Sequence, residues 1–102
     1  MNPQSSHACE VVVMLEHGLH LSPAAQIVKT AQGYRASLII QKGDRRIDGK
    51  SMLDLMTLAA ERGSRLRLEA EGEDAEQALK AVVALFEGNF GIVSPSNSQA
   101  SG

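Results

Sequence analysis

Aromatic residues are scarce in this sequence and neither sign of charge is in large excess, and each shortage argues against a class of partner. Aromatic side chains make up 3% of the 102 residues, and there is no tryptophan. Proteins that bind single-stranded nucleic acid stack bases on aromatic rings, so this composition disfavours such a role. The formal net charge of -2 reflects 10 basic and 12 acidic residues, a balance that also disfavours DNA or an anionic membrane as partner.

Cysteine and long apolar runs are scarce as well. The single cysteine, Cys9, excludes an intramolecular disulfide and a metal site built on several thiolates. His17 and His20 have no carboxylate at a recognisable ligand spacing, so we expect no metal site. Apolar runs such as Val11 to Leu15 are far shorter than the ~20 residues of a membrane span, and we expect no secretory signal. We therefore expect a soluble cytoplasmic protein.

Hydrophobic periodicity predicts elements in the order β-α-β-β-α-β-α. Helices are expected to begin near Ser22, Ser51 and Asp74, the last two with capping-box partners three residues on. Each strand has one polar face and each long helix one apolar stripe. This pattern predicts an α+β open-faced two-layer sandwich, with a four-stranded antiparallel sheet and three helices on one face. The expected strands lie at residues 11–15, 34–41, 45–48 and 64–71.

Polar residues dominate both ends of the chain. Residues 1–8 are expected to form a loose N-terminus. Residues 92–102 are rich in serine and also contain asparagine, glycine and proline, a composition typical of a disordered tail. The expected domain therefore covers residues 9–91.

A histidine stands immediately before the first expected helix, in the segment GLHLSPAA at residues 18–25. The first N–H groups of a helix have no internal partner and, with the helix dipole, form an anion site. A phosphoryl group on His20 would accept hydrogen bonds from such groups, including the N–H of Leu21, and from the Ser22 hydroxyl. Neutral imidazole is nucleophilic, which suits this role. Taken alone, the pattern is also typical of a solvated or capping histidine.

The segment from Gly43 to Ser51 ends in Gly-Lys-Ser, like a nucleotide-binding P-loop. That motif has four residues between its glycines, whereas five separate Gly43 from Gly49, and the segment spans an expected hairpin. We therefore interpret Ser51 as the N-cap of the second helix.

The second expected helix has more apolar residues than one buried face requires. Exposed methionines suit an adaptable docking surface, although a position in the core is equally compatible with the pattern. The candidate docking residues are Leu21, Met52, Leu53 and Met56.

Three segments together resemble the HPr family, the histidine phosphocarriers of the bacterial sugar phosphotransferase system. They are GLH-x-x-PAA at 18–25, GKS-x-x-x-L at 49–55 and AEGEDAEQAL at 70–79, and their spacing along the chain matches as well. The resemblance covers about residues 10–91. It implies an open-faced sandwich of four antiparallel strands and three helices, in agreement with the pattern above.

The resemblance implies a phosphoryl carrier and not a free-standing enzyme. His20 would accept a phosphoryl group from phosphorylated enzyme I and pass it to a sugar-specific IIA domain. Ser51 falls at the family's regulatory serine, which HPr kinase/phosphorylase modifies in many bacteria. A monomer without metal or cofactor is expected. The residues implied in partner docking are Leu21, Lys29, Met52, Leu53 and Met56.

Ser22 departs from the family, which usually has arginine two residues after the histidine. Serine offers a neutral hydrogen bond where arginine offers a charged fork. Charged bonds contribute roughly 1.5–3 kcal/mol against about 1 for neutral ones, so a phosphate or partner contact is expected to weaken about tenfold or more. The alternative is a regulatory relative controlled at Ser51, with vestigial transfer at His20. A purely structural module is a third hypothesis.

The first helix has two alternative starting positions. The sequence alone places Ser22 at the N-cap and Pro23 at the first helical position, because proline is tolerated there. The family begins its helix directly after the histidine. The two alternatives differ in which N–H groups face His20.

Overall fold

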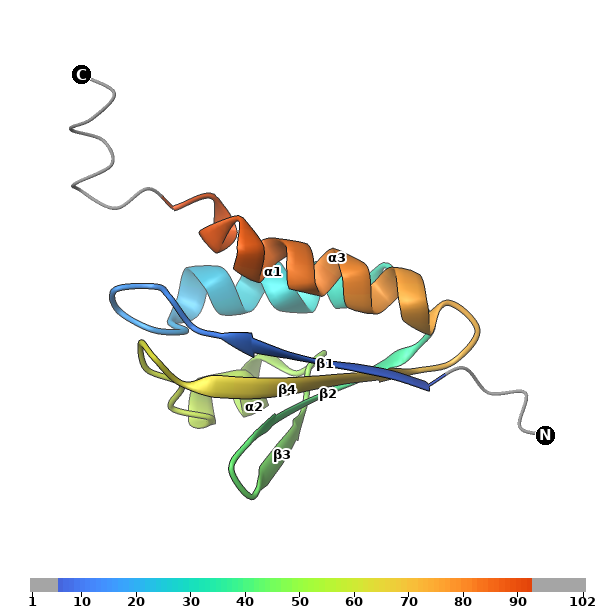
Figure 1. Cartoon of the computed structure of the whole chain (residues 1–102), viewed down its shortest axis with the longest axis horizontal. Helices are drawn as coiled ribbons and strands as arrows, with labels where there is room; N and C mark the ends of the chain where they lie inside the picture. Colours follow the sequence, from blue (N-terminus) through green and yellow to red (C-terminus); the bar gives the residue numbers. More distant parts are fainter. Residues whose placement is uncertain (1–5, 93–102) are drawn as a thin grey trace.

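The computed structural model describes residues 6–92, which fold into four strands, three α-helices and a short 3-10 turn. The observed order is the predicted β-α-β-β-α-β-α with the 3-10 turn added at the end (Figure 1). The elements are β1 (Ser6–Val12), α1 (Leu21–Gln32), β2 (Ser37–Lys42), β3 (Arg45–Asp48), α2 (Met52–Thr57), β4 (Arg65–Glu71), α3 (Ala75–Glu87) and η1 (Asn89–Gly91).

The strands form one antiparallel sheet in the order β1-β4-β2-β3. The strict alternation of β4 explains its central place: Leu66 and Leu68 are fully buried on one face, while Arg65 and Arg67 are exposed on the other. Helices α1 and α3 lie over the buried face (Figure 1). Buried Leu55 ties the short α2 to the same core. The expected open-faced sandwich is confirmed.

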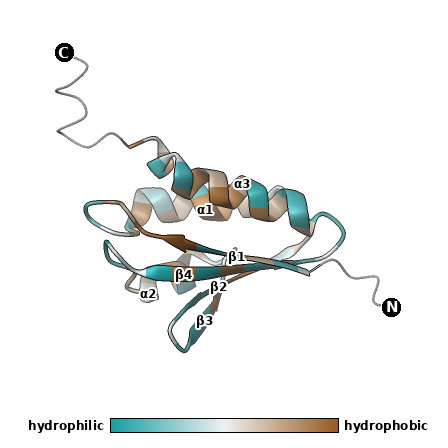
Figure 2. Cartoon of the chain, viewed as in Figure 1, coloured by the Kyte–Doolittle hydropathy of each residue, from teal (hydrophilic) through white to brown (hydrophobic). Residues whose placement is uncertain are grey.

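The core is mostly aliphatic, as the low aromatic content requires. Hydrophobic and hydrophilic stretches share each long helix, so one side packs inward and the other meets solvent (Figure 2). Ile27 of α1, Ile40 of β2 and Val82 of α3 are completely buried. Phe86 and Phe90 make an edge-to-face contact with 4.9 Å between ring centroids, which packs η1 onto the end of α3.

The first strand begins earlier than predicted. The expected strand covers residues 11–15, but β1 runs from Ser6 to Val12 and so excludes residues 13–15. Residues 6–8, assigned to a loose N-terminus, pair with β4. The inward positions of β1 before Val11 are His7 and Cys9, which are not aliphatic and therefore hide the alternation. Residues 1–5 lie outside the described residues, and so does the expected tail of residues 92–102 except for Ile92.

The Asp74 carboxylate accounts for one further boundary that differs from the prediction and for the loss of an expected helix cap. Asp74 Oδ2 and Oδ1 accept the N–H groups of Arg35 and Ala36 at 2.9 and 2.8 Å, so β2 begins at Ser37 and not at Tyr34. The bond from the Arg35 N–H is the main reason that the pKa of Asp74 lies below its usual value. Asp74 does precede α3, but its side chain makes no capping bond to that helix.

Candidate functional site

His20 is the N-cap of α1, so the helix begins at Leu21 and the prediction of Ser22 as N-cap is wrong. The backbone of His20 is extended, with φ -101° and ψ -168°, and its carbonyl accepts the N–H of Ala24 at 3.0 Å. The imidazole makes no capping bond and is exposed to solvent. Its side chain is therefore free to react at the helix N-terminus.

Two backbone donors remain open beside this imidazole. Pro23 has no N–H, and the N–H of Ala24 is already bound to His20. Within residues 6–92, the N–H groups of Leu21 and Ser22 donate to no backbone carbonyl. Both groups belong to the first turn, where the helix dipole favours an anion. The Ser22 side chain is exposed at the same end of the helix.

The loop before His20 rests on the segment that follows α2. The N–H of Leu19 donates to the carbonyl oxygen of Ala60 at 2.9 Å, and the Leu19 side chain is buried. Gly18 has a φ of +69°, and a Cβ there would lie 2.5 Å from the Ala60 oxygen. Only glycine allows both this turn and this close approach. The site is therefore built from two segments about forty residues apart in the sequence.

Ser51 caps α2, as predicted. Its Oγ accepts the N–H of Asp54 at 3.2 Å, and the serine is half-buried. Two carboxylates share this corner: Asp48 Oδ1 accepts the N–H of Lys50 at 2.9 Å, and Asp54 Oδ2 accepts the N–H of Asp48 at 3.4 Å. Two acidic side chains thus border Ser51, whose direct neighbour in the sequence is the basic Lys50.

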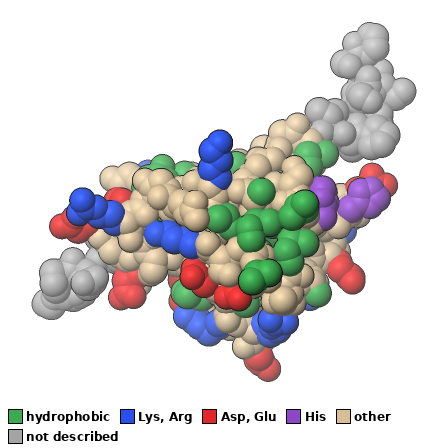
Figure 3. All heavy atoms as spheres, turned by 180° about the vertical axis from the view of Figure 1, so that it is seen from behind, with side chains coloured by type: hydrophobic (Ala, Val, Ile, Leu, Met, Phe, Trp, Pro, Cys, Tyr) green, Lys and Arg blue, Asp and Glu red, His purple; other side chains and the backbone are tan. Residues whose placement is uncertain are grey.

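Three of the candidate docking residues are strongly exposed: Leu21 (63%), Leu53 (80%) and Met56 (43%). We call these three the apolar patch. In Figure 3 hydrophobic side chains gather in one area, with histidine side chains at its edge and charged side chains around it. Met52 is less exposed than these three, being half-buried, and Lys29 is exposed on α1. Large exposed apolar side chains of this kind mark an interaction surface.

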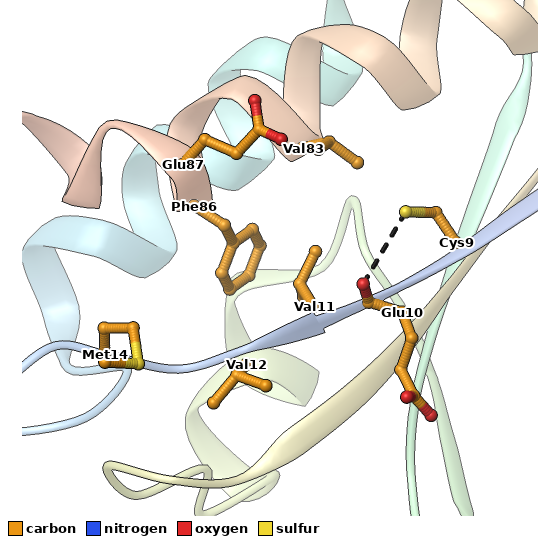
Figure 4. A pocket seen from close by; sticks show the side chains of 8 residues that line it. All are labelled: Cys9, Glu10, Val11, Val12, Met14, Val83, Phe86 and Glu87. Atoms are coloured by element: carbon orange, nitrogen blue, oxygen red, sulfur yellow. Dashed lines mark hydrogen bonds between the residues drawn. The ribbon is translucent and has the colours of Figure 1, made fainter.

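A cavity of about 310 Å³ lies elsewhere, between β1 and α3. Figure 4 shows Val11 and Phe86 facing each other across it, with Cys9 and Val83 farther along. None of its lining residues is a predicted site residue. We therefore do not assign the phosphoryl site to this cavity.

Among residues 6–92, one carboxylate has a strongly displaced pKa, and it lies on the open face of the sheet. Glu69 bonds to Arg46 at 2.9 Å and to Arg67 at 2.7 Å, and these bonds lower its pKa to about 2. Across residues 6–92 there is no group of three metal-ligating side chains that could hold an ion. No helix in that range is long and apolar enough to cross a membrane.

The sequence of residues 8–88 matches a family model described as the PTS HPr component phosphorylation site. The chain belongs to the HPr family. It is 38% identical over 77 residues to the phosphocarrier protein HPr of Haemophilus influenzae, covering 76% of this chain and 91% of that one. These similarities support a phosphocarrier function.

Solved HPr structures have the same fold. HPr from Thermoanaerobacter tengcongensis has a TM-score of 0.83 and 33% identity, covering 86% of this chain and 99% of its own. Crh, the catabolite repression protein of Bacillus subtilis, has a TM-score of 0.66 and 31% identity, covering 82% of this chain and 94% of its own. The family thus includes both phosphocarriers and a protein named for catabolite repression.

The segment beneath the His20 loop carries no signal in the sequence. Ala59 and Ala60 belong to no motif, and nothing in their side chains indicates a contact with Leu19. The lone hint is Gly18, because a glycine two residues before a candidate histidine can mark a tight turn.

Proposed function

We propose that this HPr-family protein carries a phosphoryl group on His20. It accepts the group from phosphorylated enzyme I and passes it to a sugar-specific IIA domain, acting as a cytoplasmic monomer. The observation that carries this proposal is an exposed imidazole at the N-cap of a helix with two open N–H donors. In the first transfer, the bond from phosphorus to enzyme I breaks as a bond to a neutral imidazole nitrogen of His20 forms. In the second, the bond from phosphorus to His20 breaks as a bond to the acceptor group of the IIA domain forms.

The phosphate on His20 would be held by neutral donors. Its oxygens would accept the N–H groups of Leu21 and Ser22, and the Ser22 hydroxyl would add a third bond. The helix dipole adds a favourable field but falls off within the first turn. Because no arginine stands at this position, we expect transfer to be slower than in relatives that have one.

Partner docking would use the apolar patch around the two phosphorylation sites. Leu21 comes from α1, next to His20, while Leu53 and Met56 come from α2, next to Ser51. Met52 would contribute at the patch border, and Lys29 would supply a charge to a partner's acidic side chain. Desolvating such exposed apolar side chains is a common source of binding energy at interface centres.

The regulatory alternative rests on Ser51 and on the similarity to Crh. HPr kinase/phosphorylase would place a phosphate on Ser51 at the N-terminus of α2, where a helix accepts negative charge. The carboxylates of Asp48 and Asp54 oppose that phosphate, since like charges repel. This charge arrangement favours His20 as the main phosphoryl site.

The test is to incubate the protein with enzyme I and phosphoenolpyruvate, and separately with HPr kinase and ATP. We expect acid-labile phosphate that His20→Ala abolishes. His17→Ala, which removes the neighbouring exposed histidine, is the matched control and should keep the label. Acid-stable phosphate on Ser51 alone, lost in Ser51→Ala, would replace the carrier proposal by the regulatory one.

A further inference from the structure

The segment that supports the His20 loop contains a strained residue. Ala59 has a φ of +54°, a left-handed conformation that residues other than glycine adopt only where their surroundings hold them. The next residue, Ala60, supplies the carbonyl that accepts the Leu19 N–H at 2.9 Å. The orientation of the Ala59–Ala60 pair therefore decides where the loop before His20 rests.

A lysine from the sheet holds this pair. Lys42, the last residue of β2, donates from Nζ to the carbonyl oxygen of Ala59 at 2.8 Å. The lysine is half-buried, and its bond spans seventeen residues of sequence. It is thus a tertiary contact between the sheet and the loop after α2.

A second cation of the same hairpin binds nearby. Arg45, the first residue of β3, donates to the carbonyl oxygen of Thr57 at 2.8 Å and to its Oγ1 at 3.0 Å. Helix α2 has no basic residue in its own last turn, although its terminal carbonyls carry partial negative charge. The hairpin supplies the positive charge that the helix lacks.

We propose that Lys42 is a positioning residue for phosphoryl transfer at His20. Its bond to the Ala59 carbonyl holds the Ala60 carbonyl where it can accept the Leu19 N–H. That bond in turn fixes the turn that presents His20 at the helix N-terminus. Lys42 acts through this chain of contacts and touches neither the imidazole nor its phosphate. The effect on transfer rests on the function proposed above, but the effect on the loop does not.

The structural part is tested by amide hydrogen exchange measured by NMR. In Lys42→Met, we expect the Leu19 N–H to exchange about threefold to tenfold faster, because the solvent-exposed bond from Lys42 to the Ala59 carbonyl is lost. The internal control is the N–H of Val13, which donates to the carbonyl oxygen of Ser64 at 2.9 Å. Its exchange rate should not change. Lys42→Arg should restore slow exchange. Unchanged Leu19 exchange, or equal acceleration at Val13, would overturn the proposal.

The functional part is tested by steady-state phosphorylation with enzyme I and phosphoenolpyruvate. With this protein as the substrate of enzyme I, we expect Lys42→Met to lower kcat about threefold to tenfold and to leave KM within about twofold of its original value. Lys42→Arg should restore kcat. Lys80→Met removes the same charge from α3, where Lys80 pairs with Glu76 at 3.4 Å, and should leave kcat unchanged.

The outcomes separate this inference from the carrier proposal. A higher KM with unchanged kcat would make Lys42 a docking charge and refute positioning. Full activity of Lys42→Met would also refute it while leaving the carrier proposal intact. If the unmodified protein gains no acid-labile phosphate, the carrier proposal fails, and hydrogen exchange at Leu19 still decides whether Lys42 holds the loop.

Discussion

The backbone N–H of Leu19 and the carbonyl oxygen of Ala60 lie 2.9 Å apart, and their bond joins the turn before His20 to the loop after α2. Each half of the proposed site therefore depends on the other. The turn presents the imidazole, and the loop follows the helix that carries Leu53 and Met56 and is capped by Ser51. This arrangement and the charges around it lead to specific expectations for variants of the protein.

Gly18→Ala should destabilise the fold more than a comparable glycine change. Gly18 and Gly43 both have positive φ, +69° and +60°, but only at Gly18 would a Cβ meet backbone, 2.5 Å from the Ala60 oxygen. We expect Gly43→Ala to cost about 1 kcal/mol and Gly18→Ala about 2–4 kcal/mol in the free energy of unfolding. Urea denaturation measures both. Equal losses would show that the contact with Ala60 relaxes freely.

Ser22→Arg should accelerate phosphoryl transfer from enzyme I by about tenfold, because a charged fork replaces one neutral donor. The rate is measured as acid-labile phosphate gained at His20 with time. Ala25→Arg places the same charge on an exposed position of α1 and is the matched control. If both variants accelerate equally, general attraction to the partner explains the gain; if neither does, the partner surface is adapted to serine.

Leu53→Ala should raise the KM of enzyme I for this protein about tenfold. The midpoint temperature of thermal unfolding should stay nearly unchanged. Leu53 is 80% exposed, so its removal creates no cavity in the core but takes away an anchor of the apolar patch. Met14→Ala is the control, since Met14 is also exposed (58%) but lies beside the β1–α3 cavity. An unchanged KM in Leu53→Ala would remove this leucine from the docking surface.

Asp54→Asn should make Ser51 a better substrate for HPr kinase, by roughly threefold or more. The change removes a negative charge beside the serine but leaves the backbone N–H of residue 54 bonded to Ser51 Oγ. Acid-stable phosphate on Ser51 is the measurement. Asp44→Asn, in the exposed turn between β2 and β3, removes the same charge from the hairpin and should have no effect. Equal gains in both variants would contradict a local repulsion.

The Arg46–Glu69–Arg67 group predicts a defined pH dependence of stability. The pKa of Glu69 is lowered from its usual 4.5 to about 2, so the ionised side chain favours the folded state. This contribution is complete above about pH 4.5 and is lost as the pH falls through about 2. We therefore expect Glu69→Gln to be less stable than the unmodified protein at pH 7 and equally stable below pH 2, in urea titrations. A difference independent of pH would contradict this linkage.

The sequence by itself was enough for much of the fold. Alternation at β4 indicated one buried and one exposed face, and Ser51 with its N-cap role was evident from local chemistry. These features are decided within a few residues of chain, by the period of a strand or by a bond from a side chain to its own helix. The three family motifs, which are also short stretches of chain, likewise singled out His20.

Tertiary contacts decided the rest. The sequence predicts that Asp74 caps its own helix, but the segment between α1 and β2 brings Arg35 and Ala36 within reach, and two N–H donors outcompete one cap. Strand β1 begins at Ser6 because β4 offers partners that the polar residues of β1 do not indicate. The bonds from Lys42 to Ala59 and from Leu19 to Ala60 join segments far apart in sequence. A backbone carbonyl carries no sequence signature, so only the folded chain determines which donor it meets.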